Sequence, residues 1–210
     1  MLTTNEAIYK LKRENILYRW GLTTEELTNI VDANPSLRGM MMGYVAEYKL
    51  RKMYFEDQRI SALVKDDDHD RKNKGDIRFN YRGRSFRLEC KSLQTNTIKN
   101  INHIFNATYQ CDASDSRIVR FSDGSEVKTT CLLVGEVDIV AINLFALDET
   151  WRFAFVLNQN LPRSRHKKYS MLQQRELIAS SIKIAYPLLP PYSDSPFELL
   201  DHLIDGSSPQ

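Results

Sequence analysis

Two carboxylates and one ammonium group occur in the stretch from Gly75 to Lys91, namely those of Asp76, Glu89 and Lys91. A hard divalent cation such as Mg²⁺ is held by one or two carboxylates, keeps several waters and takes its other ligands from substrate phosphate. An ammonium group beside that cation can position or deprotonate an attacking water, while the cation stabilises charge on the phosphate. These residue types therefore suit metal-dependent hydrolysis of a phosphodiester.

The spacing of the same stretch predicts a β-hairpin that gathers these groups on one face. Apolar residues recur at every second position on both sides of residues 82–83, as they do in half-buried strands. A two-residue turn at 82–83 pairs Ile77 with Leu88 and sets Asp76 across from Glu89. Opposed like charges on one face of a strand pair are destabilising, so we expect a cation between the two carboxylates.

An ordinary surface hairpin is the alternative interpretation. In that case Arg78, Arg87 and Lys91 simply neutralise the neighbouring acids, and the spacing of acids and lysine arises by chance. Further features of the sequence, outside the hairpin, favour the catalytic interpretation.

A helix upstream of the hairpin offers a third carboxylate. Asn34 followed by Pro35 is typical of a helix start, and apolar residues then recur at helical spacing over about twenty residues. Glu47 lies at the margin of this apolar stripe, so it can face inward toward a sheet. The alternative for Glu47 is an ion pair with Arg51 one turn later, and both interpretations stay open.

The three segments together resemble the PD-(D/E)xK nuclease superfamily, which includes many type II restriction endonucleases. The resemblance rests on the helix with Glu47, the Gly-Asp pair that begins a strand at 75–76, and the Glu-Cys-Lys run at 89–91. It covers about residues 35–157. It implies an α/β fold with a restriction-endonuclease-like core, in which α-helices flank a central mixed β-sheet in the order helix, three strands, helix and further strand.

The resemblance also implies roles for individual residues. Asp76 and Glu89 would be the metal ligands, Lys91 the catalytic lysine, and Glu47 a further catalytic carboxylate. The sequence departs from the superfamily pattern at one position, because Gly75 stands where that pattern has proline.

The implied activity is Mg²⁺-dependent hydrolysis of double-stranded DNA by metal-activated water, with Mn²⁺ as a substitute metal. A sequence-specific type II restriction endonuclease is the first expectation. Because one such site cuts one strand, cleavage of both strands predicts a homodimer on a palindromic target. The alternatives are a structure-specific or repair nuclease of the same fold, and a catalytically inactive DNA-binding protein.

Two groups of basic residues are candidates for binding DNA phosphates, which attract lysine and arginine by charge. One group lies in a loop after the last predicted strand of the core, and the other lies in the charged segment before Asp76. A charge run that only faces solvent is the alternative for the first group. The residues are Arg163, Arg165, Lys167 and Lys168 in the loop, and Lys72 and Lys74 in the charged segment.

Length and composition predict a single domain. The chain has 210 residues, 42% of them hydrophobic, and can bury one core. We expect one nuclease domain over 1–210, with a helical N-terminal part (1–56), a catalytic core (57–160), and a basic loop with C-terminal helices (161–205). The net charge of +2 requires any DNA-binding surface to be a local patch.

The sequence lacks the motifs of several classes of protein, and this argues against those classes. Three cysteines without CxxC spacing and four scattered histidines argue against a disulfide framework and a zinc site. No apolar run reaches the length of a membrane span, and the N-terminus has no signal-peptide pattern. We therefore expect a soluble cytoplasmic protein without a membrane partner.

The remaining segments give weaker predictions. Residues 92–131 are rich in Asn, Gln, Ser and Thr, and form either a surface excursion or a substrate-facing module; Asn and Gln can bind adenine in the major groove. Propensity and spacing predict strands over 60–65, 117–121, 126–131, 137–145 and 151–157, a capping box from Thr23 to Glu26, and helices over 173–185 and around 197–203.

Overall fold

A computed structural model describes residues 15–65 and 75–206. The chain divides into two compact units, Met1–Val45 and Ala46–Gln210. The single domain predicted over 1–210 stays a prediction. Lys72 and Lys74, both predicted to bind DNA, lie outside the described residues.

The first unit is helical in its described part. It contains α2 (Ile16–Trp20), α3 (Thr24–Ala33) and the beginning of α4 (Pro35–Leu50). The predicted capping box is confirmed: Thr23 Oγ1 accepts from the Glu26 N–H at 3.1 Å, and the Glu26 carboxylate accepts from the Thr23 N–H at 2.7 Å. The predicted helix start at Pro35 is confirmed as well.

The buried face of α4 differs from the apolar stripe that the sequence suggests. Met40 and Tyr48 belong to that stripe, yet they are 63% and 50% exposed. The buried side chains are those of Ala46 and Leu50, which are four residues apart and so share one side of the helix. The residue next to Ala46 is Glu47, so the C-terminal end of α4 sets the position of this carboxylate.

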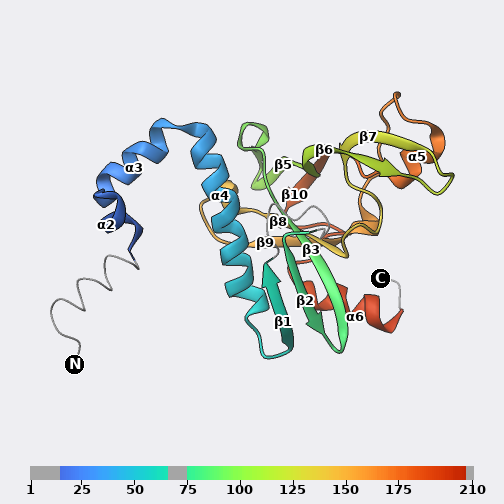
Figure 1. Ribbon diagram of the computed structural model, residues 1–210, viewed down its shortest axis with the longest axis horizontal. Helices are drawn as coiled ribbons and strands as arrows, with labels where there is room; N and C mark the ends of the chain where they lie inside the picture. Colours follow the sequence, from blue (N-terminus) through green and yellow to red (C-terminus); the bar gives the residue numbers. More distant parts are fainter. Residues whose placement is uncertain (1–14, 66–74, 207–210) are drawn as a thin grey trace. The chain divides into compact units, whose positions relative to one another are not determined.

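The second unit is built on a five-stranded mixed sheet with the order β1-β2-β3-β8-β9 (Figure 1). Neighbouring strands are antiparallel except for β3 and β8, which are parallel. This confirms a mixed α/β fold around a central mixed sheet. The strands are β1 (Ile60–Lys65), β2 (Ile77–Tyr81), β3 (Arg84–Ser92), β8 (Ile139–Asn143) and β9 (Phe153–Leu157).

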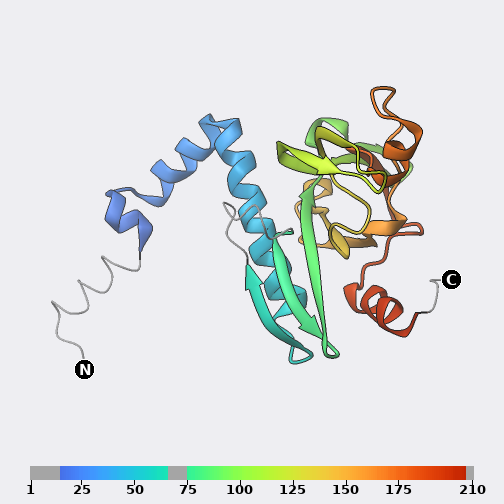
Figure 2. The same ribbon diagram turned by 45° about the vertical axis from the view of Figure 1, so that its right-hand side comes forward.

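Strands β2 and β3 form the predicted hairpin, a twisted ribbon that is seen clearly in Figure 2. Ile77 pairs with Leu88, as the alternation of apolar residues requires. The turn is made by Arg82 and Gly83, whose φ angles of 47° and 77° are both positive, as in a type I′ turn. The register of the hairpin is therefore confirmed.

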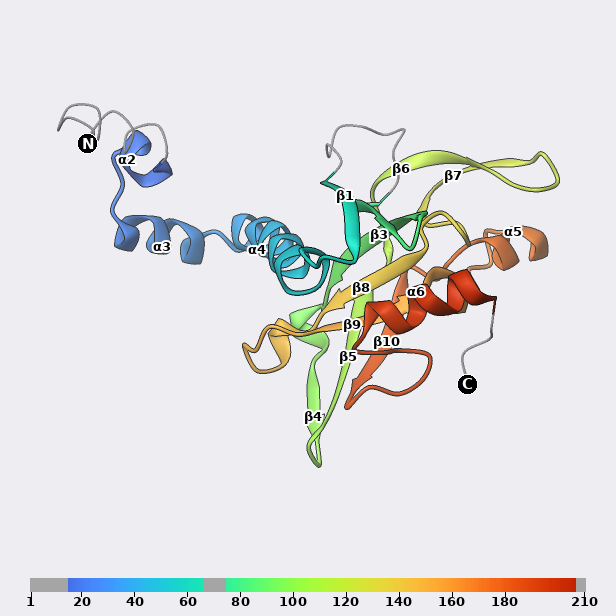
Figure 3. The same ribbon diagram turned by 90° about the horizontal axis from the view of Figure 1, so that it is seen from below.

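A β-rich segment, not a helix, makes the crossover between the parallel strands β3 and β8. The helix that the resemblance implies after the third core strand is absent from residues 93–138, all of which the structure describes. The polar segment instead folds into two hairpins, which extend toward opposite sides in Figure 3. Their strands are β4 (Lys99–Ile101), β5 (Ile104–Gln110), β6 (Asp112–Arg120) and β7 (Glu126–Cys131). A short 3₁₀ turn, η2 (Thr95–Thr97), precedes β4, and two others follow β8 and β9, namely η3 (Phe145–Leu147) and η4 (Asn158–Asn160).

The predicted helix over 173–185 is wrong. The helix α5 (Met171–Glu176) is short, and the chain continues as the strand β10 (Ser181–Tyr186). In β10 the buried residues are Ile182 and Ile184, which alternate with exposed neighbours at period two. This strand pairs with β5, and β4 completes a three-stranded sheet in the order β10-β5-β4.

One face of the central sheet is covered by helices. Ile139 and Ala141 of β8 belong to a buried cluster with residues of the π-helix η1 (Arg51–Phe55) and with Leu200 of α6 (Pro196–Asp205). The short C-terminal helix that the sequence predicts is therefore confirmed. Among the described residues, no helix combines the length and the apolar character that a membrane span requires.

The other face of the central sheet is covered by the three-stranded sheet. Val140 and Ile142 of β8 share a second cluster with Tyr109 of β5 and with Ile182 and Ile184 of β10. Alternate residues of each strand point to opposite faces, so one side of β5 and β10 is buried and the other faces away from the core. The candidate site lies on this second face of the central sheet.

Candidate active site

The candidate site is assembled where β2 begins and β3 passes beside it. Glu89 pairs with Val140 and Lys91 with Ile142, so both side chains project from the second face of the sheet. The ladder between β2 and β3 ends at Ile77, just after Asp76. Three residues that are separated in the sequence are therefore brought to one edge of a buried sheet.

Asp76 is held by two hydrogen bonds to β3. Its N–H donates to the Leu88 carbonyl at 2.8 Å, and its Oδ2 accepts from the Cys90 N–H at 2.7 Å. The carboxylate thus takes the place of a backbone carbonyl in the ladder, and it lies beside the strand segment that carries Glu89. Its position is fixed by the backbone of β3 and does not depend on a flexible side-chain contact.

The backbone conformation at position 75 explains why the sequence has glycine there and not proline. Its φ is +90°, whereas proline is restricted to about −65°, so this backbone conformation excludes proline. A Cβ atom at Gly75 would lie only 2.9 Å from the Leu88 carbonyl oxygen and 3.3 Å from Val137 Cγ1. The close approach of Gly75 to β3 brings the next residue, Asp76, against that strand.

The environment of Asp76 opposes its ionisation. Burial is the largest cause, and the negative charges of Glu89 and Glu47 act in the same direction, while the Cys90 N–H and Lys91 act against it. Together they raise the pKa of Asp76 from 3.8 to about 8. A cation bound beside Asp76 would reverse this balance.

Lys91 is held as an ammonium donor. Its Nζ donates to Glu89 Oε1 at 2.5 Å and to the Asp112 carbonyl at 2.8 Å, and its side chain is only 16% exposed. Burial lowers the pKa of Lys91, but the charge and the hydrogen bond of Glu89 outweigh burial, so the net pKa is raised. Lys91 is therefore suited to donate hydrogen bonds and positive charge, and poorly suited to accept a proton.

Glu47 lies close enough to the site to act on Asp76 electrostatically. Its Oε2 forms an ion pair with Lys65 Nζ at 2.7 Å, at the end of β1, and its side chain is 15% exposed. Within the described ranges, Arg51 makes no ion pair with Glu47. The ion pair between Glu47 and Arg51, which is one of the two interpretations that the sequence leaves open, is therefore not formed.

The chemistry of these donors favours a hard metal ion. Within residues 15–65 and 75–206, no three His, Cys, Asp or Glu side chains are arranged as a complete metal-ligand group. Asp76 and Glu89 offer carboxylate oxygens, which is the donor set of Mg²⁺ when water and phosphate supply the other ligands. Burial raises the pKa of the Cys90 thiol well above its ordinary value, so this cysteine remains neutral and is a poor ligand.

Two residues that position the site were not among the sequence candidates. The Asp112 carbonyl anchors Lys91, and a backbone carbonyl leaves no trace in the residue pattern. Asp138 accepts from the Arg87 N–H at 2.8 Å through its Oδ2 and thereby fixes the start of β8 against β3. In the sequence, the only sign of this role of Asp138 is that it is an acid at the start of a predicted buried strand.

The basic loop is placed in a different part of the second unit. Arg163 is half-buried, and its guanidinium donates to the Leu161 carbonyl and, at 2.8 Å, to the Gln159 carbonyl. Tyr169 anchors the loop to β7 through a 2.6 Å hydrogen bond with Thr129. The remaining basic side chains, Arg165, Lys167 and Lys168, are exposed.

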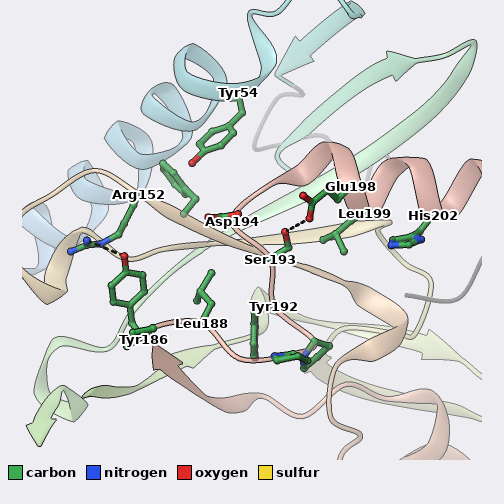
Figure 4. Close-up of a pocket in the computed structure, with 14 residues that line it drawn as sticks. Tyr54, Arg152, Tyr186, Leu188, Tyr192, Ser193, Asp194, Glu198, Leu199 and His202 are labelled. Carbon is green, nitrogen blue, oxygen red and sulfur yellow. Dashed lines mark hydrogen bonds between the residues drawn. The ribbon is translucent and has the colours of Figure 1, made fainter. Parts of the chain in front are cut away.

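A separate cavity of about 730 Å³ lies among η1, α6 and the segment that follows β10 (Figure 4). In this cavity Ser193 Oγ donates to Glu198 Oε2 at 3.0 Å, and Arg152 Nη1 donates to the Tyr186 hydroxyl at 3.4 Å. None of the candidate site residues lines it. This cavity is therefore separate from the carboxylate and lysine cluster.

The fold and the site together describe a mixed α/β protein in which Asp76, just before β2, lies beside Glu89 and Lys91 of the central strand β3. Comparisons with protein-family models, with curated proteins and with solved structures found no match. The functional argument therefore rests on the geometry of the site.

Proposed function

We propose that this protein is a Mg²⁺-dependent endonuclease that hydrolyses phosphodiester bonds of double-stranded DNA, with a β-rich crossover in place of the helix that the PD-(D/E)xK core has between its third and its further strand. The grouping of Asp76, Glu89 and Lys91 is the observation that supports this best. Lys91 donates a hydrogen bond to Glu89, and the charges of Glu89 and Lys91 both act on Asp76.

The two carboxylates suit the metal. Asp76 and Glu89 would hold it, because their charges repel each other and a cation between them removes that repulsion. When bound, Mg²⁺ lowers the pKa of water and stabilises negative charge on the scissile phosphate. Mn²⁺ has similar preferences for oxygen ligands and would replace it.

The lysine would act on the nucleophile and the phosphate. Lys91 is anchored by Glu89 and Asp112. Its remaining N–H can orient a water molecule toward phosphorus or stabilise the charge that develops on the phosphate oxygens. The water oxygen would bond to phosphorus as the P–O bond to the leaving group breaks; the water would release one proton to solvent and the departing oxygen would take one up from solvent, so that each cut consumes one water. Glu47 would assist through its charge and through water in the same site.

Within this class, a sequence-specific type II restriction endonuclease that acts as a homodimer remains our first proposal. The exposed basic residues Arg165, Lys167 and Lys168, together with Arg163, would supply phosphate contacts. Lys72 and Lys74 would do so from the segment that precedes Asp76.

The test is incubation of the purified protein with plasmid, junction, flap and damaged duplex DNA, with Mg²⁺ or with a chelator, followed by sequencing of the ends. We expect Mg²⁺-dependent cuts at discrete positions in plasmid DNA. Cuts confined to junctions, flaps or damaged bases would transfer the proposal to a repair nuclease. Binding without any cleavage, on every substrate and with Mg²⁺ present, would contradict the nuclease and favour a catalytically inactive DNA-binding protein.

A further inference from the structure

Both chain segments that form the three-stranded sheet lack acidic residues. Neither residues 90–111 nor residues 177–193 contain an Asp or a Glu, although the chain has 27 acids among 210 residues. The first segment supplies β4 and β5, and the second supplies β10. The sheet β10-β5-β4 is therefore a local region without negative side chains in a protein of nearly balanced charge.

The outer face of this sheet carries two lysines and polar side chains, with the exposed Ile101 and Ile104 toward the tip of the β4–β5 hairpin. Directly opposed residues of antiparallel strands share a face, and Lys99 pairs with Asn106 while Lys183 pairs with Thr108. Lys99, Asn106 and Lys183 are exposed and Thr108 is half-buried. The alternate residues of β5 and β10 are the buried ones that pack on the central sheet, so these four side chains face away from the core.

A groove of about 690 Å³ runs over this face. Its lining contains no carboxylate and combines Lys99, Asn106, Thr108 and Lys183 with apolar residues such as Leu189 and Pro190. Neither lysine forms an ion pair with any acid in the described part of the chain. The groove thus presents two uncompensated positive charges with amide and hydroxyl groups between them, which complements a polyanion.

The spacing of the two lysines matches a duplex. They are two strands apart across the sheet and two residues apart along it, which places their Cα atoms about 12 Å from each other. The major groove of B-DNA is about 12 Å wide and admits a two-stranded β-ribbon. Figure 3 shows that the β4–β5 hairpin extends past its neighbours as such a ribbon, and its tip residues Asn102 and His103 are exposed.

The polar face is continuous with the candidate active site. Gln110, at the end of β5, donates to Asp112 Oδ2 at 3.2 Å, and the Asp112 carbonyl accepts from Lys91. Asn106 is six residues from Asp112 along nearly continuous strands, or at most about 20 Å. At 3.4 Å per base pair, that length corresponds to about six base pairs of duplex.

We propose that the outer face of the sheet β10-β5-β4 binds the DNA duplex beside the active site, with Lys99 and Lys183 on phosphates at the two sides of the major groove. Asn106, which lies between them, then faces base edges, where an amide can bond adenine through two hydrogen bonds. The inference rests on the proposed function, because the occupant is the duplex that the site would cut.

The experiment measures binding separately from cleavage. Affinity for a labelled duplex is measured by fluorescence anisotropy in a chelator, over a range of salt concentrations, with the full chain. The double variant Lys99→Ala/Lys183→Ala is expected to bind at least about tenfold more weakly, and the slope of log K against log salt falls by about 2 because two phosphate contacts are lost. Asn106→Ala should keep the salt slope and relax base preference near the cut.

A matched control removes the same charge elsewhere. Lys128 and Arg175 are exposed on β7 and α5, so Lys128→Ala/Arg175→Ala should keep the wild-type slope within about 0.5. Thermal unfolding shows that each variant is folded. Wild-type affinity and slope in Lys99→Ala/Lys183→Ala would overturn the inference, as would tighter binding of an RNA duplex of the same sequence.

Failure of the proposed function gives a different pattern. If the wild type binds DNA through this face but never cuts it, the double variant still loses affinity, and only the nuclease proposal falls. If the wild type cuts DNA and the double variant binds and cuts as well as it does, the nuclease stands and this surface is wrong.

Discussion

At the scale of single residues, Asp76 carries an electrostatic conflict that the backbone maintains. The Gly75 backbone and two hydrogen bonds to β3 hold its carboxylate beside Glu89, although burial and like charge disfavour the ionised form. The hydrogen bond from the Cys90 N–H offsets this cost only in part, because the net pKa of Asp76 is raised. A cation bound beside Asp76 would favour the ionised form.

This conflict predicts how stability depends on pH. In the unfolded chain the pKa of Asp76 is near 3.8, and in the folded protein it is about 8. Between these values the folded state keeps a proton that the unfolded state has released, so the free energy of unfolding falls as pH rises, by up to about 1.4 kcal/mol per pH unit. Asp76→Asn removes this titration, so the variant gains stability relative to wild type from about pH 5 to about pH 8.

Denaturant unfolding without metal, at several pH values, measures this effect. Asp123→Asn is the control, because Asp123 is exposed and its pKa is lowered, chiefly by hydrogen bonds to Ser125, so it is ionised throughout this range. Parallel stability curves for wild type and Asp76→Asn would show that the burial of Asp76 carries no such conflict.

At the scale of elements, the approach of Gly75 to β3 is the feature that sets the site. Gly75→Ala places a Cβ atom against the Leu88 carbonyl and strains a backbone at positive φ, at a cost of about 1–3 kcal/mol. Gly83→Ala strains its turn similarly, but a Cβ atom there meets open space. We expect both variants to lose stability and only Gly75→Ala to lose DNA cleavage, as measured by unfolding and by cleavage rates. Equal cleavage by the two variants would argue against this role of Gly75.

The strand β10 allows a test of the corrected secondary structure. In a strand, Ile182 and Ile184 face the same core, whereas in a helix they would point in different directions. Ile182→Ala and Ile184→Ala should each cost about 2–5 kcal/mol, and Lys183→Ala less than about 0.5 kcal/mol. Chemical denaturation of the three variants measures these costs. A large loss for Lys183→Ala, or none for one isoleucine, would contradict the alternation.

The sequence predicts local pairing better than long-range pairing. The β2–β3 register follows from period-two alternation and from one glycine in a two-residue turn, both of which lie within the hairpin itself. The identity of β10 depends on β5, which is far away in the sequence, and helical spacing was an equally good local fit for 173–185. In the crossover between β3 and β8, the strands predicted over 117–121 and 126–131 are found as β6 and β7, whereas β4 and β5 were not predicted.

The contacts of the candidate site also divide into local ones, which the sequence predicts, and long-range ones, which it does not. Asp76, Glu89 and Lys91 lie in one hairpin, so their proximity could be foreseen from alternation. The anchoring of Lys91 by the Asp112 carbonyl needs the three-stranded sheet to be docked on the central one, and the sequence carries no side-chain signal for it.

At the scale of the whole molecule, the proposed endonuclease needs a second site to cut the second strand of a duplex. A homodimer predicts sedimentation at about twice 24.4 kDa and direct conversion of supercoiled plasmid to linear DNA. The measurements are analytical ultracentrifugation at the concentration of the cleavage assay and gel analysis of early products. A monomer that accumulates nicked circles would contradict the dimer and leave the chemistry of the site intact.

The central claim, that Asp76, Glu89 and Lys91 form one hydrolytic site, is tested most directly by the rate of Mg²⁺-dependent duplex cleavage in near-isosteric variants. Asp76→Asn, Glu89→Gln and Lys91→Gln should each lose at least about 100-fold in rate, while Asp123→Asn stays within about twofold of wild type. Cleavage at the wild-type rate by any one of the first three variants would contradict the account.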